Sequence, residues 1–222
     1  MGTEPAVFPQ MTLAALEIRA DKSALEIFGA LHPTDLEGIG TLILLGPREP
    51  GFWPGFIQSP EYRDGNPDAI DRWSTRVIGA LADEFGAKAF FPFGGPPYHP
   101  FIRWALDSGR AWQSPVHLLV HDRAGLFVSY RGALGFAERL TLPLQPAASP
   151  CNSCADRPCL TACPIAALSD RGYDVPACKS FLRSDAGDDC MTGGCLVRRA
   201  CPISRGYGRV AEQSAFHMKA FL

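Results

Sequence analysis

The cysteines constrain the fold of this chain more than any other feature. All eight lie in the last third of the 222 residues, and none precedes residue 151. Four fall in the run "CNSCADRPCLTACP" at 151–164, and the others are Cys178, Cys190, Cys195 and Cys201. Large apolar side chains are sparse in this segment, so burial alone stabilises it poorly. We therefore expect a metal or cross-links, bound or formed by the thiols, to hold it together.

The expected compartment bears on what the thiols do. The opening residues "MGTEPAVFPQ" lack the basic and apolar regions of a secretory signal peptide. This predicts a cytoplasmic protein, in which grouped thiols are more often metal ligands or redox groups than disulfides. A net charge of −2 gives no reason to expect nucleic acid as the main partner. The longest apolar runs are far shorter than the roughly 20 residues of a spanning helix, so no membrane association is expected.

The expected helices and strands predict an α+β fold with two domains. Residues 1–147 are expected to form an α+β domain, and residues 148–222 a cysteine-rich module. Between them, the proline-rich stretch 140–150 is typical of an extended connector.

Hydrophobic spacing predicts the elements of the first domain. Apolar residues recur at three- and four-residue intervals over 67–86, which indicates a helix. The stretch 114–134 is expected to form a β-hairpin, because two apolar runs flank "HDRAG" and Leu126, Val128 and Tyr130 alternate in the second. Further helices are expected at 11–22 and 99–108, and strands at 24–33, 40–46 and 87–93.

The cysteine spacing is close to that of known cluster ligands. Bacterial two-cluster ferredoxins use C-x2-C-x2-C-x3-C-P. Here the first run is C-x2-C-x4-C-x3-C-P, and the second, from Cys190 to Pro202, is C-x4-C-x5-C-P. Short gaps suit a cubane because neighbouring thiolates must converge on the irons of one compact cluster. The spacing by itself leaves zinc open, which also accepts four thiolates, and it leaves disulfides open too.

A resemblance makes the pattern more specific. "CNSCADRPCLTACPIAAL", "ACKSFLRS" and "CMTGGCLVRRACPI" resemble the ferredoxin-like module of epoxyqueuosine reductases and reductive dehalogenases, with three of the gaps widened by two residues. The resemblance implies two [4Fe–4S] clusters and uses all eight cysteines. It implies that one cluster takes Cys151, Cys154, Cys159 and Cys201, and that the other takes Cys163, Cys178, Cys190 and Cys195.

The first domain carries its own resemblance. "GTLILLGPREPGFWPGF", "PYHPF" and "SPVHLLVHDRAGLFVSYRGALGF" resemble the cobalamin-processing protein of the methylmalonic aciduria and homocystinuria type C family, whose nitroreductase-like domain binds a corrinoid. This implies a cobalamin site, for which the candidate residues are Tyr98, His99, Tyr130, Arg131 and Gly132. Each has an ordinary structural alternative, such as a hydrogen-bonded histidine at a helix start or a tyrosine at the core edge. FMN is the other cofactor of such domains, and no local feature distinguishes it from a corrinoid.

Together these patterns predict an iron–sulfur oxidoreductase that passes electrons through two clusters to a corrinoid or similar acceptor in the N-terminal domain. Its partners would be a small-molecule or corrinoid substrate and a redox-partner protein. The alternative is a ferredoxin-like electron carrier whose N-terminal domain only binds partners. Arg198, Arg199, Arg205 and Arg209 are candidates for docking an acidic electron donor, or else an ordinary solvated surface. Motifs of hydrolases, zincins, NTPases and dinucleotide-binding proteins are absent from the sequence.

Overall fold

The structure is a computed structural model that describes residues 12–146 and 148–222. The chain divides into two compact units, and each takes two stretches of sequence. The first unit comprises the described residues up to Trp104 together with Ser129–Pro143. The second comprises Ala105–Val128 and the described residues from Leu144 to Leu222.

This division differs from the predicted boundary between 147 and 148. Residues 105–128 were expected in the N-terminal domain, but they pack with the cysteine-rich segment. The physical reason is that the cysteine-rich segment has too few large apolar side chains for a core of its own. Residue 147 and residues 1–10, in which no signal peptide was expected, lie outside the described residues.

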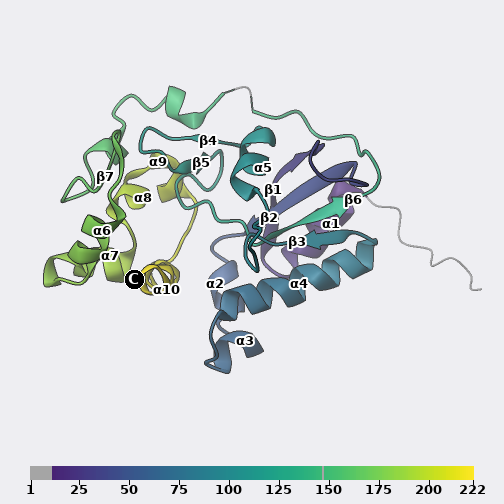
Figure 1. Ribbon diagram of the computed structural model, residues 1–222, viewed down its shortest axis with the longest axis horizontal. Coiled ribbons are helices and arrows are strands. Elements are labelled where there is room, and N and C mark those ends of the chain that lie inside the picture. Colours follow the sequence, from purple (N-terminus) through teal and green to yellow (C-terminus); the bar gives the residue numbers. More distant parts are fainter. Residues whose placement is uncertain (1–11, 147) are drawn as a thin grey trace, which may run out of the picture. The chain divides into compact units, whose positions relative to one another are not determined.

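The first unit is built on an antiparallel sheet with the strand order β1-β2-β6-β3 (Figure 1). Helices packed on an antiparallel sheet define an α+β unit, which confirms that part of the predicted fold class. Its elements are α1 (Leu13–Asp21), β1 (Leu25–Leu31), β2 (Thr41–Pro47), α2 (Phe52–Phe56), α3 (Pro60–Arg63), α4 (Ala69–Phe85), β3 (Lys88–Phe90) and β6 (Gly132–Phe136); α5 (Phe101–Asp107) crosses into the second unit.

The predicted helix at 67–86 is confirmed as α4, whose apolar side is buried against β6 and β3. A Cβ atom added at Gly132 of β6 would lie 2.8 Å from Cδ1 of Ile78, so a glycine at this position lets α4 approach the sheet. All seven residues of β2 are buried, as expected for a strand with a neighbour on each side. The predicted strands at 24–33, 40–46 and 87–93 and the predicted helix at 99–108 also form, each within a few residues of the expected bounds.

The second unit consists of short elements joined by turns. They are β4 (Ala111–Gln113), β5 (Leu119–His121), the 3₁₀ turns η1 (Pro150–Asn152), η2 (Pro158–Leu160) and η3 (Asp185–Gly187), β7 (Leu168–Ser169), β8 (Gly172–Tyr173), α6 (Val175–Leu182), α7 (Asp188–Gly193), α8 (Leu196–Ala200), α9 (Pro202–Gly206) and α10 (Ala211–Phe221). No helix among the described residues of either unit has the length and apolar character needed to cross a membrane.

The predicted hairpin over 114–134 is wrong. Strand β5 pairs with β4, and beyond a single bridge between His121 and Gly125 the ladder does not continue. The second predicted strand is divided between the units: Leu126 packs in the core of the second, whereas β6 begins at Gly132 and pairs with β2 and β3 in the first. Burial in two separate cores therefore overrides the local alternation of apolar residues.

Candidate metal centre

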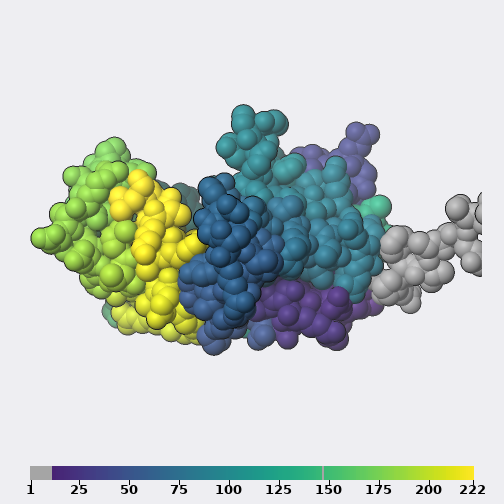
Figure 2. Space-filling view, turned by 90° about the horizontal axis from the view of Figure 1, so that it is seen from below, coloured from purple at the N-terminus to yellow at the C-terminus, as the bar shows by residue number. Residues whose placement is uncertain are grey.

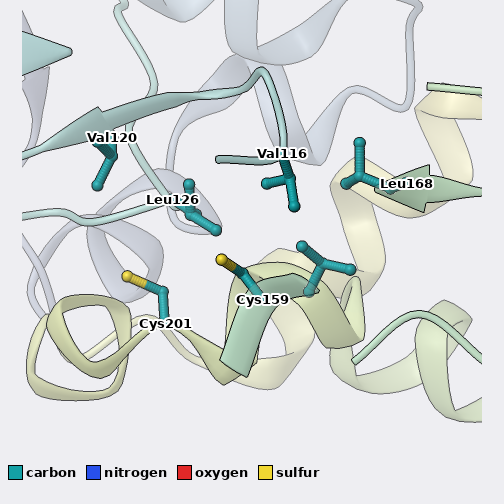
Figure 3. Packing of buried hydrophobic residues seen from close by; sticks show 7 residues of the cluster. Val116, Val120, Leu126, Cys159, Leu168 and Cys201 are labelled. Atoms are coloured by element: carbon teal, nitrogen blue, oxygen red, sulfur yellow. The ribbon is translucent and has the colours of Figure 1, made fainter. Parts of the chain in front are cut away.

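The core of the second unit mixes apolar side chains with cysteines. Val116, Val120 and Leu126 come from the 105–128 segment, and they pack with Cys159 and Cys201. In Figure 3 the side chain of Cys159 is directed toward Leu126, whereas that of Cys201, which comes from a different segment, is directed to the side on which Val120 lies. Leu168 and Val197 complete the buried set. The segment inserted before β6 thus supplies apolar surface that covers the cysteines.

Four cysteines line one cavity in this unit. Its volume is about 480 Å³, and its lining includes Cys151, Cys154, Cys159 and Cys201. Cys151 lies on η1, Cys159 lies on η2, and Cys201 lies between α8 and α9. These four thiols, which the resemblance assigned to a single cluster, are therefore brought to one cavity by the neighbouring turns around η1 and η2 and by the junction of α8 and α9, which is distant in sequence.

The other four cysteines form a second neighbourhood. Electrostatic interactions join Cys178 to Cys163 and Cys195, and join Cys190 to Cys195. The hydroxyl of Tyr173 donates a hydrogen bond of 3.4 Å to Sγ of Cys178. In the first set, the corresponding interactions join Cys151 and Cys159 to each other and to Cys154 and Cys201. The cysteines thus fall into two sets of four.

Burial raises the pKa of one or more thiols in each set. For Cys151, Cys159, Cys178 and Cys190, removal from solvent is the largest cause, and neighbouring cysteines of the same set raise the pKa further. These four thiols are therefore protonated near neutral pH when no metal is bound. A metal must displace those protons when it binds, because the thiolate is the ligand.

All eight cysteines are free thiols. Within residues 12–146 and 148–222, no three His, Cys, Asp or Glu side chains lie close enough to share one metal ion. A tetrahedral zinc with Zn–S bonds of about 2.3 Å draws its sulfurs to within about 3.8 Å of one another. In a cubane each thiolate binds an iron of its own. The two kinds of centre thus require different spacings of the same four thiols.

Polar side chains lie beside the cysteines, and two of them, Ser114 and Tyr173, were not singled out from the sequence. Ser114 lines the first cavity, and its buried hydroxyl has no hydrogen-bond partner in the part of the chain that the structure describes. Arg198 is partly buried, donates to the carbonyl of Leu126 and interacts electrostatically with Cys195 and Tyr173. The position of Tyr173, five residues before Cys178, is a sequence feature from which such a role could have been inferred, and no feature of the sequence indicates one for Ser114.

The predicted arginine surface is only partly exposed. Besides Arg198, Arg199 forms an ion pair of 2.6 Å with Asp189, and the guanidinium of Arg209 lies 5.5 Å from the ring centroid of Phe127. Arg205 is exposed, lines the first cavity and donates to the carbonyl of Arg199. Of the four arginines, Arg205 best fits the interpretation as a docking residue beside the first cysteine set.

The corrinoid candidates all lie in the first unit. Tyr98 has 65% of its surface exposed. The ring of His99 stacks on Trp104, with centroids 5.6 Å apart, and meets the ring of Phe90 edge-on. His99 is thus placed by aromatic packing at the start of α5, and Tyr98 remains open to solvent.

The remaining candidates lie at the start of β6. Tyr130 is buried and meets the ring of Phe28 edge-on at 5.9 Å. Nη1 of Arg131 lies 3.8 Å from Oδ1 of Asp71, and Nη2 donates to the hydroxyl of Ser129. Gly132, as described above, accommodates α4. Contacts within the first unit thus engage all three residues.

In comparisons with known proteins, no family model, no curated protein and no solved structure matches this chain. The candidate site therefore rests on the geometry described here.

Proposed function

We propose that this protein is an iron–sulfur oxidoreductase. Its second unit holds two [4Fe–4S] clusters, and electrons pass through them to an acceptor bound by the first unit, with a corrinoid as the candidate acceptor. The observation that carries the proposal is the grouping of the eight cysteines into two sets of four, one of them around a single cavity.

The donors at the first cavity fit a cluster. Four thiols supply the ligands that a cubane requires, one for each iron. Val120 and Leu126 give the cavity an apolar wall that keeps water from the metal. The unpartnered hydroxyl of Ser114 is a donor for which a cluster sulfur is a suitable acceptor, and a buried hydroxyl left without one costs about 1–3 kcal/mol.

When bound, such clusters supply one-electron transfer. The chain itself provides thiolates after the bound protons leave, and it keeps the ligands partly or fully out of solvent. It also places a cation at the second set, because Arg198 is held by the Leu126 carbonyl and its charge acts on Cys195. Positive charge and apolar cover are both determinants of cluster reduction potential.

A ferredoxin-like carrier without a corrinoid is the second candidate. The specific observation in its favour is that Tyr130 and Arg131 are already engaged, one in aromatic packing and the other in an ion pair with Asp71. Titration of the anaerobic protein with cobalamin separates the two candidates. A saturable change in the corrinoid spectrum supports the first, and an unchanged spectrum with no measurable affinity supports the carrier.

The cluster proposal is tested by iron and acid-labile sulfide per chain, together with an absorption spectrum, on protein prepared without oxygen. We expect about eight of each and broad absorbance near roughly 400 nm, the stoichiometry of two cubanes. Cys159→Ser and Cys190→Ser each replace a buried ligand of a different set, so each is expected to retain about four irons. The matched control is Ser153→Ala at an exposed position between two ligands of the first set. Zinc in place of iron in the unsubstituted protein would overturn the proposal.

A further inference from the structure

Helix α10 buries a polar side chain that has no partner. Gln213 is fully buried, and neither its amide oxygen nor its amide nitrogen has a hydrogen-bond partner among the described residues. The buried positions of α10 are Gln213 and Ser214, in place of the apolar residues that a packed helix normally buries. An unsatisfied buried amide costs about 1–3 kcal/mol.

The buried side of α10 lies against the segment that carries two cysteines of the second set. Helix α10 packs on α7, which contains Cys190 (Figure 1). Gly194 directly precedes Cys195, and a Cβ atom added there would lie 2.7 Å from Cβ of Ser214. Figure 2 likewise shows α10 in yellow alongside the green segment that includes α6 and α7. Ser214, the residue next to Gln213 on α10, is therefore in contact with a chain segment that connects two thiols of one set.

Tyr173 brings a second donor to the same set, and α10 supports it. Its hydroxyl donates to Sγ of Cys178 at 3.4 Å. Its ring stacks on Phe221 near the end of α10, with centroids 6.2 Å apart and an angle of 12° between the planes. Two donors, an amide and a hydroxyl, thus depend on α10.

We propose, resting on the proposed function, that the Gln213 amide and the Tyr173 hydroxyl donate hydrogen bonds to sulfur atoms of the cluster held by Cys163, Cys178, Cys190 and Cys195, and that they raise its reduction potential. Reduction adds one electron and thus one negative charge to the cluster, and no covalent bond forms or breaks. Donors aimed at sulfur stabilise that added charge. Both residues are positioning and tuning groups, and neither is a ligand.

The test uses the full chain reconstituted anaerobically and titrated with dithionite as the reductant, with electron paramagnetic resonance reporting each cluster. Cys190→Ser identifies the signal of the second cluster, since it removes one of its ligands. Gln213→Met replaces the amide by an apolar side chain of similar volume, and Tyr173→Phe removes one oxygen while keeping the ring on Phe221. Gln58→Met and Tyr62→Phe, which make the same changes in the first unit, are the matched controls.

We expect each test variant to lower the potential of the second cluster alone, by about tenfold in the one-electron equilibrium, which corresponds to about 59 mV. Gln213→Met is also expected to raise the thermal midpoint of the cluster-free protein, because it removes the unpartnered amide. If Gln213 had only a structural role, Gln213→Met would shift the thermal midpoint without changing the reduction potential of the second cluster. Two clusters with unshifted potentials in both variants overturn this inference alone, whereas a chain that binds no iron overturns the proposed function with it.

Discussion

Gly125→Ala tests how the inserted segment holds the first cysteine set. Gly125 has φ of +56°, and a Cβ atom there would lie 2.5 Å from the backbone nitrogen of Ser204 and 2.6 Å from its hydroxyl. Ser204 is buried on α9, the helix that follows Cys201, and its hydroxyl accepts a 2.8 Å hydrogen bond from the backbone N–H of Leu126. The turn at Gly125 is therefore a close contact between two cavity-lining segments, and its space is available only to glycine.

The expected cost follows from these contacts. Alanine in the left-handed region costs about 1 kcal/mol relative to glycine. The clash involves the backbone of Ser204, so α9 must move, and the Leu126 hydrogen bond worth about 1 kcal/mol is weakened. With overpacking of at least about 1 kcal/mol, the free energy of unfolding of the second unit is expected to fall by about 3 kcal/mol. Because Cys201 moves with α9, iron bound by the first set is expected to fall as well.

Hydrogen exchange of peptides within residues 111–128 and 148–206, which exclude β6, measures this unit separately from the first. The matched control is Gly65→Ala, at φ of +67° with no atom within 4 Å of the added Cβ. It carries the same backbone penalty without the clash, and we expect it to cost about 1 kcal/mol in its own region. Equal costs for the two substitutions would show that the approach of Ser204 to Gly125 does not constrain the fold, and the reasoning would be refuted.

Two pH effects are also expected. Since burial raises the pKa of thiols such as Cys159 and Cys190 in the folded, cluster-free protein, stability is fully present below about pH 8.5, the ordinary pKa of cysteine in the unfolded chain, and falls as the pH rises above it. Urea denaturation at increasing pH measures this, and Cys159→Ser should flatten the profile; an unchanged slope in that variant contradicts the assignment. In the first unit, hydrogen bonds from Arg76 lower the pKa of Glu61, which is 8% exposed. The stabilisation is therefore present above about pH 4.3 and lost as the pH falls. Glu61→Gln should reduce the acid dependence of hydrogen exchange in α3 and α4. Identical pH profiles of exchange in the variant and the unsubstituted protein would count against this explanation.

The elements that the sequence predicted well are those determined by local spacing. Helix α4 has apolar residues at three- and four-residue intervals over 17 residues, and this periodicity needs no knowledge of distant segments. Strands β1 and β2 are continuous apolar runs bounded by turns. The α+β class followed from such elements. By contrast, β4 has three residues and no periodicity, so its pairing with β5 could not be seen in advance.

Long-range contacts account for what the sequence did not show. Strand β6 pairs residue for residue with β2, with Phe136 opposite Thr41, and no local pattern specifies such a distant partner. Leu126 was expected in the same strand as Tyr130, yet the two pack in different units. The chain thus passes from the second unit to the first in the middle of an alternating apolar run. Alternation indicates that a segment is half-buried, and it does not indicate in which core.

The candidate site shows the same limit. The spacing and the resemblance identified the cysteines and their two sets, whereas the residues around them depend on folding. Arg198 was interpreted as a surface charge, but it donates a hydrogen bond to the carbonyl of Leu126. The predicted hairpin gave no reason to expect an arginine at that carbonyl. Ser114 and Gln213 are polar residues of ordinary type, and only their burial without partners distinguishes them.

Because each unit takes two stretches of sequence, the two units are completed at different times during synthesis. A ribosome releases Val116, Val120 and Leu126 before any of the cysteines with which they pack. Strand β6 follows next and completes the sheet of the first unit, while the apolar segment before it still lacks its covering partners. The first cysteine set remains incomplete until Cys201 has emerged. Nascent chains therefore pass through an interval in which one unit is finished and the other exposes apolar surface, and a chaperone has access to that surface during this interval.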